Sequence, residues 1–201
     1  MNLVGDLLAR DRRTRDPALV TPDGRERTHH DLITNGYKAA NVLRYLGVRA
    51  GATVAVEPTA GFHTTLAFLG AAAVGAPVRF DPAAGIGAGD RVVLAPVATA
   101  DALDPAPGTN LAAFGGPPDR PDTTHWEKEL WSENPGMPPS DVAPGDPVVR
   151  GADGDVSHRD LCSLAAAAVE TADIGDETRV VLRAPFSDPS ALAAGLAAPL
   201  S

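Results

Sequence analysis

The most constraining part of the sequence is the stretch Asp146–Leu161, which combines a short apolar run, a glycine turn and a helix start. The apolar run is Val148-Val149, and the turn spans residues 151–154. Ser157 is a favourable N-cap residue, and Asp160 follows at the spacing of a shortened capping box. A strand, a glycine turn and a helix N-terminus together form a common phosphate cradle, because free N–H groups and the helix dipole both favour an anion.

The same pattern occurs earlier in the chain, at residues 23–32. Asp23-Gly24 corresponds to Asp153-Gly154, and Thr28-His29-His30-Asp31-Leu32 corresponds to Ser157-His158-Arg159-Asp160-Leu161. A helix is predicted after each stretch, and then a buried strand, with Arg179–Leu182 corresponding to Thr53–Val56. An Ala/Gly/Leu-rich helix follows in each case. We infer two related αβα units that pack side by side.

Hydrophobic periodicity predicts the remaining elements. The predicted helices cover residues 3–13, 28–46, 62–74, 124–133 and 189–200, in addition to the helix after Ser157. The predicted strands cover residues 18–21, 26–28, 53–56, 77–80, 91–94 and 179–182, with a further short strand near 110–114. Strands that alternate with helices indicate an α/β fold, here a three-layer αβα arrangement with a mostly parallel sheet and a small N-terminal hairpin.

This pattern predicts a single α/β domain over residues 1–201. Unit one covers about residues 17–82, a Pro-rich connector covers about 95–147, and unit two covers about 148–201. The 44% hydrophobic content suffices for a buried core, and the 4% aromatic content requires that Ala, Val and Leu build it.

Charge and cysteine content exclude several classes of partner. The net charge of −9 argues against nucleic acid and anionic membrane as partners. Cys162 is the only cysteine, so no intramolecular disulfide forms and a cytoplasmic location is expected. The N-terminus lacks the pattern of a signal peptide, and no apolar run is long enough to span a membrane.

Residues 146–161 resemble the phosphate-loop region of the AMP-forming synthetase/ligase superfamily, which includes acyl-CoA synthetases. Members carry a D-P-A-hydrophobic run, a loop T-S-G-(S/T)-T-G-x-P-K-G-V and then S-H-R-N-L. This chain has Asp146-Pro147-Val148-Val149 before the loop and Ser157-His158-Arg159-Asp160-Leu161 after it.

The N-terminal part resembles the same superfamily over about Pro17–Pro82. Members read T-(Y/F)-x-E-L, a helix, G-V-x-x-G-D-x-V-A-V, a helix and G-A-x-x-x-P. The corresponding residues here are Thr28–Leu32, Gly47-Val48, Gly51, Val54–Val56, Gly75-Ala76 and Pro82. The resemblance therefore implies the fold of an acyl-CoA synthetase-like N-terminal subdomain.

The loop departs from the superfamily's pattern in length and in chemistry. The Thr/Ser-rich arm and the Lys are absent, while Asp153 and Asp155 would repel a polyanion. The superfamily's later adenylation motifs would fall beyond Ser201. The element P-(L/F)-x-H matches Pro185–Asp188 without its His. The resemblance therefore implies a truncated, degenerate homologue.

The best remaining nucleotide-binding elements are Gly151, Gly154 and the amide groups near Ser157. They would take an adenine nucleotide or CoA. Adjacent Ser157 and His158 do not face each other at a helix start, so capping is favoured over catalysis, and no catalytic residue is predicted.

The other residues whose side chains could bind a metal or a ligand are predicted to have structural roles. Consecutive His29 and His30 on a helix point about 100° apart, so no metal site is expected. His63 is placed in a helix-entry loop in preference to an anion contact. Trp126 and Trp131 are predicted to pack over the sheet edge rather than stack on a base, and Cys162 to be a buried thiol.

The expected function is that of a non-catalytic binding, regulatory or scaffold protein, a pseudoenzyme on the ligase fold. The surface that relatives bury against their other half should be partly apolar, so a homodimer or a protein partner is expected. The alternative is one half of a split adenylate-forming ligase that a partner chain completes. An unrelated enzyme on this scaffold remains a third possibility, which fold alone does not exclude.

Overall fold

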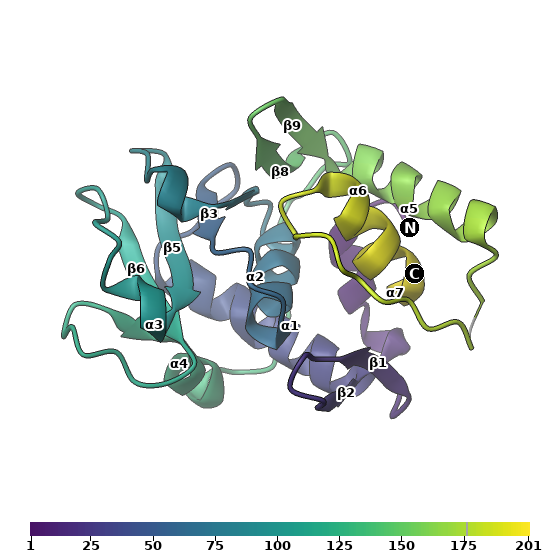
Figure 1. The fold of residues 1–201 in the computed structure, drawn as a ribbon, viewed down its shortest axis with the longest axis horizontal. Helices are drawn as coiled ribbons and strands as arrows, with labels where there is room; N and C mark the ends of the chain where they lie inside the picture. Colours follow the sequence, from purple (N-terminus) through teal and green to yellow (C-terminus); the bar gives the residue numbers. More distant parts are fainter. Residues whose placement is uncertain (176) are drawn as a thin grey trace.

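Seven strands form one mostly parallel sheet in the computed structural model, which describes residues 1–175 and 177–201. The strand order is β7-β6-β5-β3-β4-β8-β9, and only β9 runs antiparallel, to β8 (Figure 1). The strands are β3 Thr53–Val56, β4 Val78–Phe80, β5 Asp90–Pro96, β6 Asn110–Phe114, β7 Thr124–His125, β8 Pro147–Gly151 and β9 Gly154–Ser157. β1 (Pro17–Val20) and β2 (Glu26–Thr28) form a separate antiparallel hairpin. The predicted α/β class, parallel sheet and N-terminal hairpin are thus confirmed.

The helices connect the strands in the predicted alternation. The longer ones are α1 His29–Tyr45, α2 Phe62–Ala73, α4 Trp126–Ser132 and α5 His158–Ala172, and α3 is the short turn Val97–Ala100. The last run consists of α6 Pro189–Leu192, the π-helical η4 Ala193–Ala197 and α7 Ala198–Leu200. The 3₁₀ segments are η1 Val4–Leu8, η2 Arg10–Arg12 and η3 Pro82–Ala84. The single helix predicted over residues 3–13 is therefore wrong, because the chain turns at Ala9 between η1 and η2.

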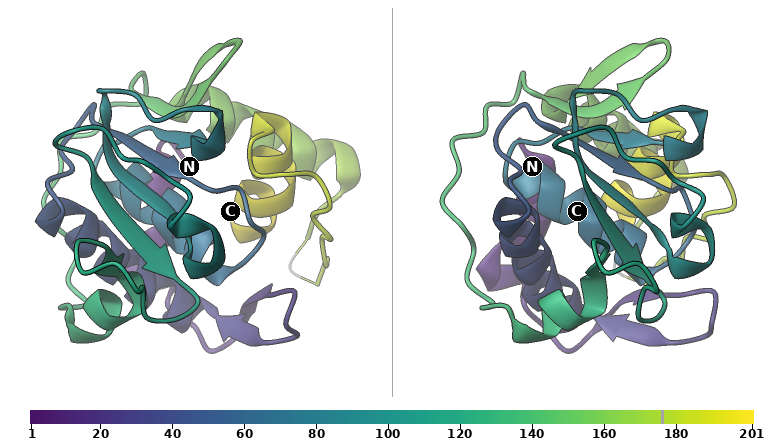
Figure 2. Two further views of the ribbon diagram at one scale, coloured as in Figure 1. Left: turned by 60° about the vertical axis from the view of Figure 1, so that its left-hand side comes forward. Right: turned by 90° about the vertical axis from the view of Figure 1, so that its left-hand side faces the viewer.

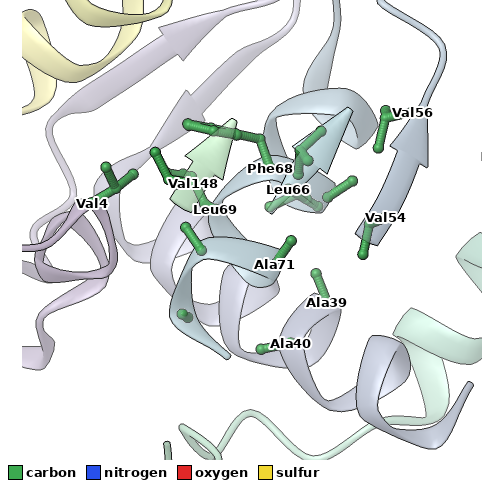
Figure 3. Close-up of a cluster of buried hydrophobic side chains, with 14 of the residues drawn as sticks. Val4, Ala39, Ala40, Val54, Val56, Leu66, Phe68, Leu69, Ala71 and Val148 are labelled. Carbon is green, nitrogen blue, oxygen red and sulfur yellow. The ribbon is translucent and has the colours of Figure 1, made fainter. Parts of the chain in front are cut away.

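Helices α1 and α2 cover one face of the sheet. Val54 and Val56 point toward them, because alternate strand residues share a face, and they join Leu66 and Leu69 of α2 in the main core (Figure 3). The two helices approach closely at Gly70, where an added Cβ would lie 2.9 Å from the backbone nitrogen of Ala40.

The other face carries a second, smaller cluster. Ala55, Val93 and Leu111 form it, and partly buried side chains from the loops after β4 and β5 pack against it. On the same face Arg79 of β4 donates to Asp90 at the start of β5, with 2.6 Å between Nη2 and Oδ2. Asp90 also accepts from the amide of Gly87, which fixes the loop between the two strands.

The predicted strand Arg179–Leu182 is wrong. These residues belong to no strand or helix, and Val181 is 76% exposed. A strand needs a neighbouring strand for its N–H and C=O groups, and the sheet ends at β7 and β9. The second unit therefore has no counterpart of β3, whereas the helix predicted over residues 189–200 is present as α6, η4 and α7.

The two ends of the chain lie close together. The η1 segment contacts α5, and α7 packs against α5 as well. Arg12 donates to the backbone carbonyl of Leu200, and the termini are neighbours in all three views (Figures 1 and 2). In the part of the chain that the structure describes, every helix is too short or too polar to cross a bilayer.

Candidate functional site

The β8–β9 hairpin takes the place that the sequence predicted for a phosphate loop. Gly151 pairs with Gly154, so Ala152 and Asp153 form a two-residue turn between the strands. Gly154 has φ +125°, a conformation that L side chains rarely adopt. The glycine turn is thus the tip of a tight hairpin.

The first turn of α5 has its amide groups already bonded within the chain. Ser157 Oγ accepts from the amide of Asp160 at 3.1 Å and donates to Asp160 Oδ2 at 2.6 Å. The amide of His158 donates to the carbonyl of Asp146 at 3.0 Å, and that of Arg159 donates to the carbonyl of Pro144 at 2.8 Å. An anion at this helix start would have to displace these acceptors.

A shallow hollow of about 490 Å³ lies beside this helix start. It is lined by Gly145, Pro147, Asp155, Ser157, Arg159 and Asp160. The lining has two carboxylates, Asp155 and Asp160, and one guanidinium, that of Arg159. Hydrogen bonds from the Ser157 hydroxyl and amide hold the pKa of Asp160 below its usual range. This charge balance disfavours a polyphosphate in the hollow.

The three predicted nucleotide-binding residues do not converge. Ser157 lines the hollow, whereas Gly151 and Gly154 lie at the hairpin tip outside its lining. Nucleotide binding by these residues stays a prediction that binding measurements have to test.

His158 is a fully buried side chain with a structural contact. Its Nδ1 accepts from the amide of Val4 at 3.2 Å, and its Nε2 is buried without a partner among the described residues. Burial lowers the pKa of the His158 imidazole, while Asp146 and Asp6 oppose this effect. The hydroxyl of Ser157 is engaged by Asp160, so the two neighbours do not form a nucleophile–base pair.

Two of the other predicted structural roles are confirmed, and one is wrong. Trp126 is fully buried, and Cys162 is buried with its pKa raised by that burial. Trp131, which was predicted to pack, is instead 88% exposed, because it lies on the outer side of the short helix α4. Asp31, which follows His29 and His30, bonds to Thr28 as its capping partner. Within residues 1–175 and 177–201 no three metal-ligating side chains gather.

Sequence reasoning missed a second hollow, between α1, α2 and α4. Arg27, Lys38 and Glu127 line it together with His63, which the sequence had placed only at a helix entry. These residues are up to 100 positions apart, so local patterns did not connect them. The one available signal was that Lys38 is one of only two lysines in the chain.

The chain is similar in structure to AMP-forming ligases over nearly its whole length. It matches ATP-bound MatB from Rhodopseudomonas palustris (TM-score 0.80, 17% identity, 99% of this chain and 43% of that chain). It matches the anthranilate CoA ligase AuaEII in complex with anthranoyl-AMP (0.79, 18%, 98% and 42%). It also matches the N-terminal domain of FACL13 from Mycobacterium tuberculosis (0.74, 21%, 100% and 55%).

These matches confirm the expected resemblance at the level of the fold. The chain spans 42–55% of the length of these three structures. No family model matches the sequence, and no curated protein matches it either.

Proposed function

We propose that this chain is a relative of the N-terminal part of AMP-forming ligases that acts as a binding or scaffold protein and forms no adenylate by itself. The supporting observation is that the first amides of α5 all donate to acceptors within the chain. A phosphate loop needs such amides free, because they and the helix dipole bind the anion.

The chemistry of the surrounding side chains supports the same proposal. Asp155 and Asp160 face the hollow at the start of α5, and Arg159 is the one cation in its lining. The lysine that the ligase loop carries has no counterpart between Gly151 and Ser157. A triphosphate approaching this hollow would therefore meet net repulsion.

Isothermal titration of the chain with ATP, AMP and CoA at matched salt tests the proposal. We expect no binding of any of the three, while MatB, which is known with ATP bound, serves as the positive control. Saturable binding of an adenine nucleotide would overturn the claim that the loop has lost its function.

An exposed apolar segment supports an assembly role for the proposed scaffold. Residues Arg179–Leu182 belong to no strand or helix, and Val180 and Val181 are 37% and 76% exposed. We infer that a second copy or a protein partner covers them, because neighbouring exposed valines leave apolar surface in water that an interface would bury.

Light scattering after gel filtration at several concentrations tests this assembly. We expect a mass above that of the monomer, and Val181→Ser is expected to reduce it. Val20→Ser is the matched control, because Val20 is also exposed but lies on the β1–β2 hairpin. A monomer mass at every concentration, with no partner recovered, would contradict the inference.

The share of the ligases that the chain matches favours one alternative, a split ligase. The chain corresponds to 42–55% of the three structures above. In this alternative another polypeptide carries the remaining part of the ligase. Co-expression with a neighbouring reading frame that carries the later ligase motifs, followed by a pyrophosphate-exchange assay, tests it. Exchange that requires both chains would favour this alternative over the scaffold.

A further inference from the structure

A hollow of about 330 Å³ lies between α1, the first turn of α2 and α4. α4 packs beside α1 below the sheet (Figure 1). The lining residues are Arg27, Asn35, Lys38, Phe62, His63, Leu66, Glu127, Leu130 and Trp131. This volume is in the range of small-molecule sites, and the hollow shares no residue with the one at the start of α5.

Two cations of this hollow have no acidic partner among the described residues. Lys38 Nζ donates only to the carbonyl of Trp131, at 3.4 Å. The guanidinium of Arg27 lies 4.6 Å from the centre of the Phe62 ring, and its Nε is buried without a hydrogen-bond partner. A chain of net charge −9 thus keeps two unpaired positive groups in one place, which favours an anionic ligand.

The one carboxylate of the hollow accepts a hydrogen bond at one of its two oxygens. Glu127 Oε1 accepts from the amide of Gly115 at 2.5 Å. The Nε2 atoms of His63 and His125 lie 3.7 Å and 3.4 Å from the two Glu127 oxygens. Glu127 Oε2 is buried without a hydrogen-bond partner among the described residues, and the two histidines carry charge only when protonated. The lining therefore holds two cations, Arg27 and Lys38, against one carboxylate, which leaves an excess of one positive charge.

The rest of the lining is apolar and partly aromatic. Phe62, Leu66 and Leu130 are buried and form the floor. Trp131 also lines the hollow and is 88% exposed. An indole this exposed leaves a large apolar area in contact with water. A flat apolar ligand group that packs against the Trp131 indole would remove apolar surface of both the ligand and the indole from water.

We propose that this hollow binds a small organic anion that carries a flat apolar group, of the class of aromatic carboxylates. The carboxylate lies between Arg27 and Lys38, and the ring lies against Trp131 and the leucine floor. Charge-assisted hydrogen bonds supply the orientation, and the aromatic contact supplies most of the buried area. This site is independent of the proposed loss of adenylation at α5.

Titration with benzoate, followed by tryptophan fluorescence, tests the proposal. Trp126 is fully buried and Trp131 is exposed, so a change in emission that Trp131→Phe abolishes reports the site. We expect saturation with a Kd below about 1 mM and no saturation by benzyl alcohol, the neutral analogue. Equal responses to both compounds, or no saturable binding of benzoate, would overturn the proposal.

The two lysines provide a matched pair of variants. Lys38→Met is expected to weaken benzoate binding by about tenfold or more. Lys128→Met removes the same charge at an exposed position outside the lining and should leave the Kd unchanged. Glu127→Gln should bind at least as tightly as the parent chain. If both lysine variants weaken binding equally, the effect is one of net charge and the site is wrongly placed.

Discussion

Thr28 and Ser157 hold equivalent positions at the starts of α1 and α5, with φ/ψ angles of −80°/164° and −80°/165°. Each hydroxyl accepts from the amide of an aspartate three residues later, at 3.1 Å in both cases. The next amides also correspond, since His29 donates to a carbonyl of Asp16 and His158 to a carbonyl of Asp146, both at 3.0 Å.

The correspondence extends into the preceding hairpins. Pro17 pairs with Thr28 and Pro147 pairs with Ser157, and each hairpin has a register shift directly after that proline. Two segments about 130 residues apart therefore build the same hairpin and capped helix. At Ser157 this arrangement occupies the helix start, where the resemblance had implied a phosphate site.

Removal of either cap hydroxyl is expected to destabilise the fold. Thr28→Ala and Ser157→Ala should each lower the free energy of unfolding by about 1 kcal/mol, because the amide at the third helical position loses its acceptor. Urea unfolding followed by circular dichroism measures the change. Ser163→Ala is the control within α5, since this exposed hydroxyl donates only to the carbonyl of Arg159, and its loss should change little.

Stability is expected to fall in mildly acidic solution because of His158. Its folded pKa is lowered by burial, and its unfolded pKa is about 6.5. The neutral imidazole accepts from the amide of Val4, so protonation both charges a buried ring and removes that bond. The contribution is fully present above about pH 6.5 and is lost progressively as the pH falls below that value toward the folded pKa.

Urea midpoints measured between pH 7.5 and 5, about one unit either side of the unfolded pKa, check this dependence. His158→Asn should flatten the curve, because the amide oxygen of asparagine can replace Nδ1 as the acceptor without titrating. His30→Asn, at an exposed position, should leave the slope as it is. An unchanged slope in His158→Asn would assign the effect to other groups.

The ion pair between Arg79 and Asp90 is expected to matter far more than the surface pair between Arg120 and Asp122. The Asp90 side chain is only 4% exposed, so Asp90→Ala leaves Arg79 Nε and the Gly87 amide without their acceptor and the partly buried guanidinium without its counter-charge. We expect a loss of about 3 kcal/mol. Asp122→Ala removes the exposed carboxylate that pairs with Arg120. The thermal midpoint of this variant should stay near that of the parent chain.

The crossing of α1 and α2 depends on the absence of a side chain at Gly70. Gly70→Ala would place Cβ 2.9 Å from the backbone nitrogen of Ala40, and a helix backbone cannot give way cheaply. We expect a net loss of about 2 kcal/mol by chemical denaturation. Gly5→Ala is the control, because its Cβ would lie 3.4 Å or more from its nearest neighbours in Ala73, which is ordinary van der Waals contact.

Local chemistry explains why several elements were predictable. The capping boxes at Thr28 and Ser157 involve groups three residues apart, and the glycine turn at residues 151–154 is set by backbone conformation. Strand β3 was recognised because its apolar run is buried on both faces. β9, in contrast, was missed because its residues are mostly polar and it pairs only at the edge of the sheet.

The sequence by itself determined the α/β class, the two capped helices and the resemblance to the ligase fold, because each rests on residues close together in the chain. The tertiary structure decided the strand order, the exposure of Val181 and Trp131, and the occupation of the α5 amides by Asp146 and Pro144. It also placed Arg27 and Lys38 in one hollow with Glu127. These features depend on partners about 10 to 100 or more residues away, and the choice among such partners is made by packing of the whole core rather than by local propensity.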